Sequence, residues 1–107
     1  MSDSGPIPSR NVRGLGDDLY RALLTPRSSD EMARLLADLC TPAELRSLAE
    51  RWHVARLLDA GKLSYREIHE ATGVSTTTIV RVARFLKQEN NRGYALAIER
   101  TGGGDAD

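Results

Sequence analysis

The sequence predicts an all-α protein of about six helices that includes a helix-turn-helix. Apolar residues recur at three- and four-residue spacing along most of the 107 residues, which is the period of an amphipathic helix. Residues that cap helices stand where these periodic segments begin and end. Two short segments between Ser64 and Lys87 are joined by a tight glycine turn, and no stretch alternates apolar and polar residues as a strand does. The length corresponds to one domain.

The first part of the chain predicts an arm and two short helices. Residues 1–14 are rich in Ser, Pro, Gly and Arg, so we expect a flexible arm. A first helix is predicted over about residues 17–24, and Thr25-Pro26 ends it because the residue before proline disfavours the helical conformation. Cap candidates at positions 28–30 precede a second helix that runs to Cys40. Both helices are amphipathic and short, so each needs a partner surface.

A longer third helix has the clearest start in the chain. The run Thr41-Pro42-Ala43-Glu44 combines a Thr cap, a Pro at the first helical position and a Glu that closes a capping box. The helix is predicted to run to Ala60, with Gly61 as its stop. Its apolar residues are Leu45, Leu48, Trp52, Ala55 and Leu58. Trp52 is expected to anchor the core, since an indole on such a stripe buries a large apolar area.

The segment from Ser64 to Lys87 predicts two capped helices and the turn between them. Ser64 and Glu67 form a capping box at the first start. Gly73 can adopt the left-handed conformation that ends this helix, and Ser75 caps the second one. On the second helix one face is apolar (Ile79, Val82, Leu86), and basic residues lie elsewhere on the surface (Arg81, Arg84, Lys87).

The chain ends with a short helix and a tail. The run Asn90-Asn91-Arg92-Gly93 breaks the preceding helix, and a last helix is predicted from Tyr94 to Arg100. Residues 15–100 are therefore predicted to form the helical domain, and residues 101–107, TGGGDAD, a disordered acidic tail.

Composition limits the classes of function. The 15 basic and 15 acidic residues cancel, yet the stretch from Lys62 to Arg92 has six basic residues against three acidic ones. The single cysteine excludes an intramolecular disulfide. No segment has the length of a membrane span or the apolar core of a signal peptide, so we expect a soluble, cytoplasmic protein. We expect no catalysis, cofactor or metal, because no nucleophile, acid and base stand at useful spacing and neither His53 nor His69 has a second ligand nearby.

A basic second helix after a glycine turn is typical of proteins that place a recognition helix in the DNA major groove. The hydroxyl run at positions 75–78 supports this interpretation, because small donors on the first turn can meet phosphates or base edges. The alternative is an ordinary αα-hairpin whose charged face is simply solvated.

The run from Cys40 to Lys87, CTPAELRSLAERWHVARLLDAGKLSYREIHEATGVSTTTIVRVARFLK, resembles the Trp repressor superfamily. It is most similar to the YerC/YecD-type members, whose pattern the upstream segments LYRALL and ARLLADLC also match. The resemblance covers about Gly16 to Arg100. It implies a six-helix subunit that interlocks with a second copy in an intertwined homodimer and reads a near-palindromic operator in double-stranded DNA.

The resemblance also implies which residues approach DNA. They are Arg66 and His69 in the first helix of the motif and Thr76, Thr77, Thr78, Val80 and Arg81 in the second. Arg84 and Lys87 are suited to the DNA backbone by their charge. His69 stands where many such motifs have a small residue, which makes the packing between the two helices a point to check.

Control by a ligand is where the sequence departs from the family. Arg51 and Arg81 match the two arginines that hold free tryptophan in the Trp repressor, but Val82 and Phe85 stand where a glycine and a serine are expected. Phe85 would project into the space that an indole needs. We therefore predict that tryptophan is not bound and that the dimer needs no corepressor. Binding of a different small ligand is the alternative.

Three functions compete at this point. The first is a homodimeric transcriptional regulator, acting as a repressor. The second is a helical dimer that has kept the fold but docks a protein, which the balanced charge and acidic tail favour. The third is an enzyme, against which we note that no Ser, Cys, His and carboxylate constellation stands at useful spacing and that a chain this small offers little enclosed pocket. Salt separates the first two, because counterion release makes DNA binding steeply salt-dependent.

Overall fold

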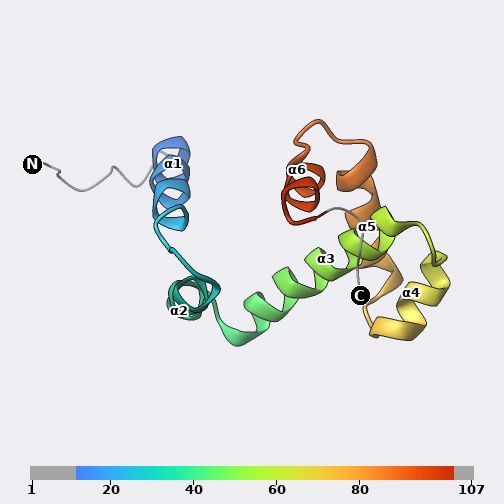
Figure 1. Cartoon of the computed structure of the whole chain (residues 1–107). Coiled ribbons are helices and arrows are strands. Elements are labelled where there is room, and N and C mark those ends of the chain that lie inside the picture. Colours follow the sequence, from blue (N-terminus) through green and yellow to red (C-terminus); the bar gives the residue numbers. More distant parts are fainter. Residues whose placement is uncertain (1–11, 103–107) are drawn as a thin grey trace, which may run out of the picture. The chain divides into compact units, whose positions relative to one another are not determined.

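A computed structural model describes residues 12–102, and these form helices joined by short turns (Figure 1). The helices are α1 (Val12–Leu23), α2 (Ser29–Leu39), α3 (Pro42–Ala60), α4 (Tyr65–Thr72), α5 (Thr76–Lys87) and α6 (Gly93–Arg100). No strand occurs between residues 12 and 102, so the all-α prediction with six helices is confirmed. The chain divides into two compact units at Pro42, and each is described by itself.

Helix α1 begins earlier than the sequence pattern predicts. It starts at Val12 rather than near residue 17, and therefore includes three residues that were assigned to the flexible arm. Gly14 and Gly16 lower the helix propensity of this start, which is why composition alone favours an arm. Leu15 and Leu19 nevertheless continue the four-residue apolar spacing back through the glycines. The rest of the expected arm, residues 1–11, lies outside the described residues, as does 103–107 of the tail.

Helix α2 starts as its cap residues predict. The Ser28 hydroxyl accepts a hydrogen bond of 3.1 Å from the Glu31 backbone N–H. In return, the Glu31 carboxylate accepts one of 2.8 Å from the Arg27 backbone N–H. No residue of α2 is buried. The helix is thus well closed at its start but leaves its apolar residues open to a partner.

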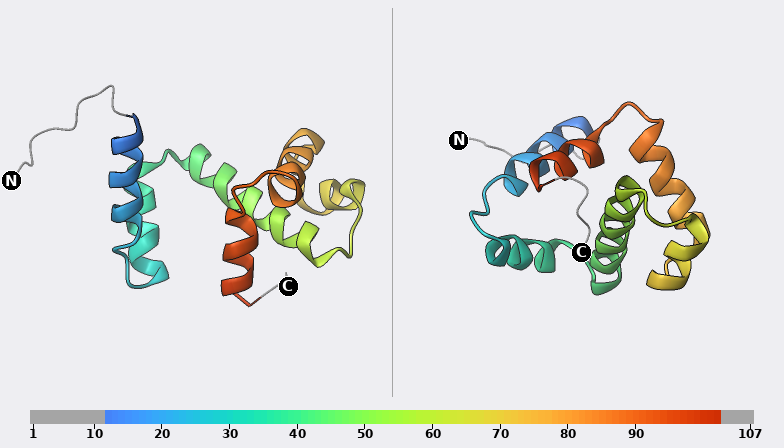
Figure 2. Two further views of the ribbon diagram at one scale, coloured as in Figure 1. Left: turned by 90° about the horizontal axis from the view of Figure 1, so that it is seen from above. Right: turned by 45° about the vertical axis from the view of Figure 1, so that its right-hand side comes forward.

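The second unit is built around the C-terminal half of α3, which α4, α5 and α6 cover (Figure 2). Its buried residues are Val54, Ala55 and Leu58 of α3, Ile68 of α4, Val74 of the turn, Ile79, Val82 and Ala83 of α5, and Ile98 of α6. Trp52 is half-buried and packs against this core, in line with its expected role. Leu48, nearer the start of α3, is 45% exposed, so the predicted apolar stripe continues beyond the core of this unit.

Local hydrogen bonds fix both helices of the helix-turn-helix. The Ser64 hydroxyl accepts from the Glu67 N–H at 3.1 Å while the Glu67 carboxylate accepts from the Ser64 N–H at 2.8 Å, which is the predicted capping box. Gly73 ends α4 with a left-handed φ of 77°. Ser75 caps α5, since its hydroxyl accepts from the Thr78 N–H at 3.2 Å.

Helix α6 begins one residue before the predicted start, after Arg92 in a left-handed conformation with φ 58°. It buries Ile98 against the core. Among the described helices, none is long and apolar enough to cross a membrane.

Candidate nucleic-acid interface

Helix α5 has one face in the core and another open to solvent. Ile79 and Val82 are fully buried, and Ala83 is nearly so. The exposed residues of α5 are Thr76, Thr77, Val80, Arg81, Arg84 and Lys87. These six are all among the residues expected to approach DNA. The amphipathic pattern therefore places them together on the surface of one helix, where a groove of duplex DNA could receive them.

The first turn of α5 is polar and carries no acidic residue. Thr76 and Thr77 are exposed and lie on the first turn, at the positive end of the helix dipole, which favours phosphate. Thr78 differs from these two, because it is half-buried and its Oγ1 accepts a hydrogen bond of 3.1 Å from the Ser75 hydroxyl. Thr78 thus contributes to the cap of α5 as well as to the hydroxyl run.

Two arginines of α5 are oriented by contacts within the chain. The guanidinium carbon of Arg81 lies 4.5 Å from the centroid of the Phe85 ring, and that of Arg84 lies 5.9 Å from it. Arg84 also forms an ion pair in which its Nε donates to the Glu89 carboxylate at 2.8 Å. Lys87 is exposed on the last turn. Two of the three cationic side chains of α5, Arg81 and Arg84, therefore lie beside one aromatic ring, and the charge of Arg84 is also paired with a carboxylate.

Helix α4 contributes the two further residues that were expected near DNA. Arg66 is exposed and pairs with Glu70 one turn later at 3.4 Å. His69 donates from Nδ1 to the backbone carbonyl of Val74 at 2.7 Å, since a carbonyl can only accept. The ring thereby bridges α4 and the turn, and Ile68 beside it is fully buried. A histidine at this position therefore stabilises the packing of the motif instead of disturbing it.

The turn between the two helices is held by a second side chain. The Thr72 hydroxyl donates to the Ile68 carbonyl at 2.7 Å and accepts from the Val74 N–H at 3.1 Å. Val74 itself is 5% exposed and belongs to the core. Hydrogen bonds from residues on both sides of Gly73 thus hold the turn that sets the orientation of α5 relative to α4.

Of the four positions compared with a tryptophan site, two border the same hollow. Arg81 and Phe85 border an open hollow of about 380 Å³ together with Asn91, Gly93 and Tyr94 of the segment that leads into α6. Val82 is 1% exposed, lies in the core and is not among the residues around this hollow. Arg51 is half-buried on α3 and is not among the residues around this hollow.

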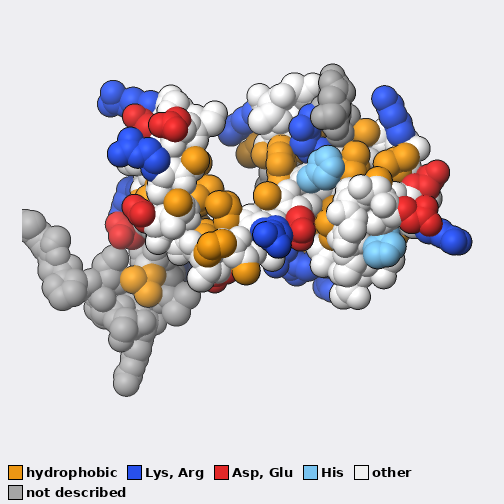
Figure 3. Space-filling view, turned by 90° about the horizontal axis from the view of Figure 1, so that it is seen from below, with side chains coloured by type: hydrophobic (Ala, Val, Ile, Leu, Met, Phe, Trp, Pro, Cys, Tyr) orange, Lys and Arg blue, Asp and Glu red, His pale blue; other side chains and the backbone are white. Residues whose placement is uncertain are grey.

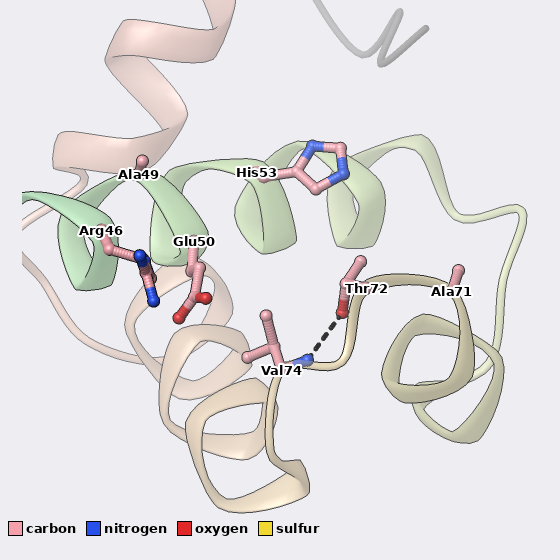
Figure 4. Close-up of a pocket in the computed structure, with 7 residues that line it drawn as sticks. All are labelled: Arg46, Ala49, Glu50, His53, Ala71, Thr72 and Val74. Carbon is pink, nitrogen blue, oxygen red and sulfur yellow. Dashed lines mark hydrogen bonds between the residues drawn. The ribbon is translucent and has the colours of Figure 1, made fainter. Parts of the chain in front are cut away.

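A second hollow, of about 370 Å³, lies between α3 and the end of α4 (Figure 4). Arg46, Ala49, Glu50 and His53 come from α3, and Ala71, Thr72 and Val74 face them from α4 and the turn. Within residues 12–102, no three His, Cys, Asp or Glu side chains come close enough to hold a metal ion. The hollow also contains no cysteine or serine beside its histidine.

The acidic partners of the basic residues were missed by the sequence analysis. The Arg66–Glu70 pair has the four-residue spacing of neighbours on a helix and could have been found from it. Arg84 and Glu89 are five residues apart and meet only because the chain leaves the helix after Lys87. No periodic pattern would predict that contact.

A tightly held turn followed by a basic, solvent-exposed helix defines the class of helix-turn-helix DNA-binding regulators. The chain belongs to the Trp repressor family, because the profile of the Trp repressor protein matches residues 16–101. It is also 42% identical over 84 residues to the uncharacterised protein YerC of Bacillus subtilis, covering 78% of this chain and 79% of that protein. A Trp operon repressor homologue of Chlamydia trachomatis is 36% identical over 72 residues, 64% of this chain and 77% of its own.

Solved structures agree with this family. The crystal structure of a TrpR-like protein from Eubacterium eligens superimposes with a TM-score of 0.74 at 40% identity, over 80% of this chain and 87% of the other. A Staphylococcus aureus protein described as a candidate Trp repressor gives a TM-score of 0.75 at 33% identity, over 87% and 95% of the two chains. The predicted superfamily and its YerC-type branch are thereby confirmed.

Proposed function

We propose that the chain is a transcriptional repressor that binds a near-palindromic site in double-stranded DNA as a homodimer, without tryptophan as corepressor. Such a regulator works in the cytoplasm, on the nucleoid. The observation that carries the proposal is the solvent-exposed face of α5, which follows a turn held by hydrogen bonds. Two exposed threonines and three cationic side chains lie on this face: Thr76, Thr77, Arg81, Arg84 and Lys87. Threonine hydroxyls and arginines suit phosphates and base edges, and a fixed turn holds them in one register.

The homodimer is supported by apolar side chains in the first unit. Leu15, Leu19 and Leu24 are 43%, 39% and 83% exposed, and α2 buries none of its residues. Figure 3 shows hydrophobic side chains open at the surface of this part of the molecule. Helices this short are marginal without packing, so a second copy that covers these residues would stabilise them. Two copies also supply the two recognition helices that a near-palindromic site requires.

Independence from tryptophan is supported by Phe85. The ring already stacks with Arg81 and lies near Arg84, so the chain supplies the aromatic group that would otherwise have to come from a ligand. A side chain that holds these cations in place removes the affinity penalty of a binding conformation that is rarely populated. A different small molecule in the hollow beside Tyr94 is the competing form of control.

The test is selection from a random duplex library at two salt concentrations, with and without tryptophan. We expect enrichment of a near-palindrome that does not depend on tryptophan and is weakened at the higher salt, because bound phosphates release counterions. The Arg81→Ala and Thr77→Ala variants should lose selectivity yet keep the helical circular-dichroism spectrum, since both side chains are exposed. No enrichment under any of these conditions would instead favour a dimer that docks a protein.

A further inference from the structure

Val80 is an apolar side chain on a surface where folding does not need one. It is 55% exposed, whereas the neighbouring apolar residues Ile79 and Val82 are 0% and 1% exposed. Helix propensity does not explain it, because a β-branched residue is less favourable in a helix than alanine or the long polar residues. The side chain of Val80 is therefore available to whatever α5 contacts.

The neighbours of Val80 define the kind of contact. One turn before it stand the exposed hydroxyls of Thr76 and Thr77, and one turn after it stands Arg84. The next residue, Arg81, is held over the Phe85 ring. Val80 is thus a small apolar spot between hydrogen-bond donors and cations, about the size of one methyl contact, which is too small for a protein-docking surface.

We propose that Val80 reads the C5-methyl group of a pyrimidine in the major groove and so sets the base preference of the proposed DNA site. The inference rests on the proposed function. In the major groove that methyl group is the apolar feature of a base pair, and a valine methyl can exclude water from it. Thymine always carries the group, and cytosine carries it only when methylated. Hydrogen bonds alone would not distinguish thymine from uracil, since both bases present the same hydrogen-bonding edge. The methyl groups of Thr76 and Thr77 are the alternative source of an apolar contact, so a Val80 variant has to show which side chain is responsible.

The experiment compares random duplex libraries synthesised with thymine and with uracil, which differ by that methyl group alone. We expect tighter binding to sites selected from the thymine library, by about fourfold for each Val80–methyl contact and by about sixteenfold for a dimer with two contacts. A third library with 5-methylcytosine in place of cytosine and uracil in place of thymine tests the other source. If methylated cytosine is the source, the thymine and uracil libraries bind equally and the third library alone binds more tightly.

Two variants show whether Val80 is responsible. Val80→Ala should bind thymine and uracil sites equally, and its thermal midpoint should match the parent because the side chain is exposed. Lys87→Ala should weaken binding to both libraries by the same factor, since a phosphate contact carries no base information. Enrichment by the parent that ignores every methyl group would overturn the inference and leave the proposed function standing. Failure to retain any library would overturn both.

Discussion

At the scale of single residues, Glu89 limits the positive charge that α5 can offer to phosphate. Its carboxylate accepts from Arg84 Nε at 2.8 Å, and the arginine is otherwise open to solvent. Glu89→Gln keeps the shape and removes the charge. We expect DNA affinity to rise by up to about fivefold per subunit, which is the upper range for one exposed ion pair. The slope of affinity against salt should steepen by about one freed cation per subunit.

The control for this change is Glu99→Gln, which removes the same charge from an exposed position on α6. Both variants are measured by fluorescence anisotropy over a series of salt concentrations. Equal affinities for the two variants would mean that net charge, and not release of Arg84, controls binding.

Phe85 is the second residue whose role is testable alone. Its ring supports Arg81 at 4.5 Å and Arg84 at 5.9 Å from the centroid. Phe85→Leu keeps an apolar side chain but loses the aromatic face, so we expect DNA affinity to fall about two- to fivefold for loss of one cation–π contact. Phe85→Tyr retains the face and should bind like the parent. An anisotropy titration in which leucine performs as well as tyrosine would argue against the aromatic support.

At the scale of elements, the turn between α4 and α5 depends on Gly73. Its φ of 77° is left-handed, so an added Cβ is strained even though no atom lies within 4 Å of it. Gly73→Ala should cost about 1–2 kcal/mol and lower the thermal midpoint by several degrees, read by circular dichroism at one fixed protein concentration. Gly93→Ala is the control. Gly93 has open space and no left-handed φ, and lies in α6, so alanine there should be neutral or stabilising.

The helices that were predicted best from the sequence are those whose ends are set by local hydrogen bonds. The starts of α2, α4 and α5 are fixed by a serine that accepts from the N–H three residues on, and such caps can be identified from residue types alone. The predicted start of α1 was wrong. Gly14 and Gly16 suggest a flexible arm, but the helix continues through them and begins at Val12. Propensity is a weak guide where packing decides.

The candidate site was predictable only as a set of positions. The three-and-four pattern separated the exposed residues of α5 from the buried Ile79 and Val82. It could not reveal that His69 donates to the Val74 carbonyl, because that bond exists only once the turn has formed. The resemblance, by contrast, grouped Val82 with Phe85 at a ligand site, although Val82 is a core residue and Phe85 borders the hollow, since a resemblance aligns positions without giving their surroundings.

At the scale of the whole molecule, stability should depend on protein concentration if a second copy covers the first unit. The thermal midpoint of the parent should rise with protein concentration, as for any folded state stabilised by association.

The Leu19→Glu variant tests the same interface directly. It places a charge among the apolar residues of α1, so the protein should sediment as a monomer instead of a dimer in a sedimentation-velocity experiment. Ala37→Glu adds the same charge at an exposed position of α2 and should remain dimeric. A parent that sediments as a monomer at every concentration would exclude the homodimer.

The ion pairs Arg66–Glu70 and Arg84–Glu89 bear on competition within a genome. A repressor meets on the order of 10⁶ or more incorrect sites for each correct one. Its hold on incorrect sites comes almost entirely from phosphate attraction. If the chain is the repressor proposed above, two carboxylates that balance two of its arginines would reduce that hold, while hydroxyl and methyl contacts at the correct site would be unaffected. Fewer molecules would then be sequestered along the chromosome.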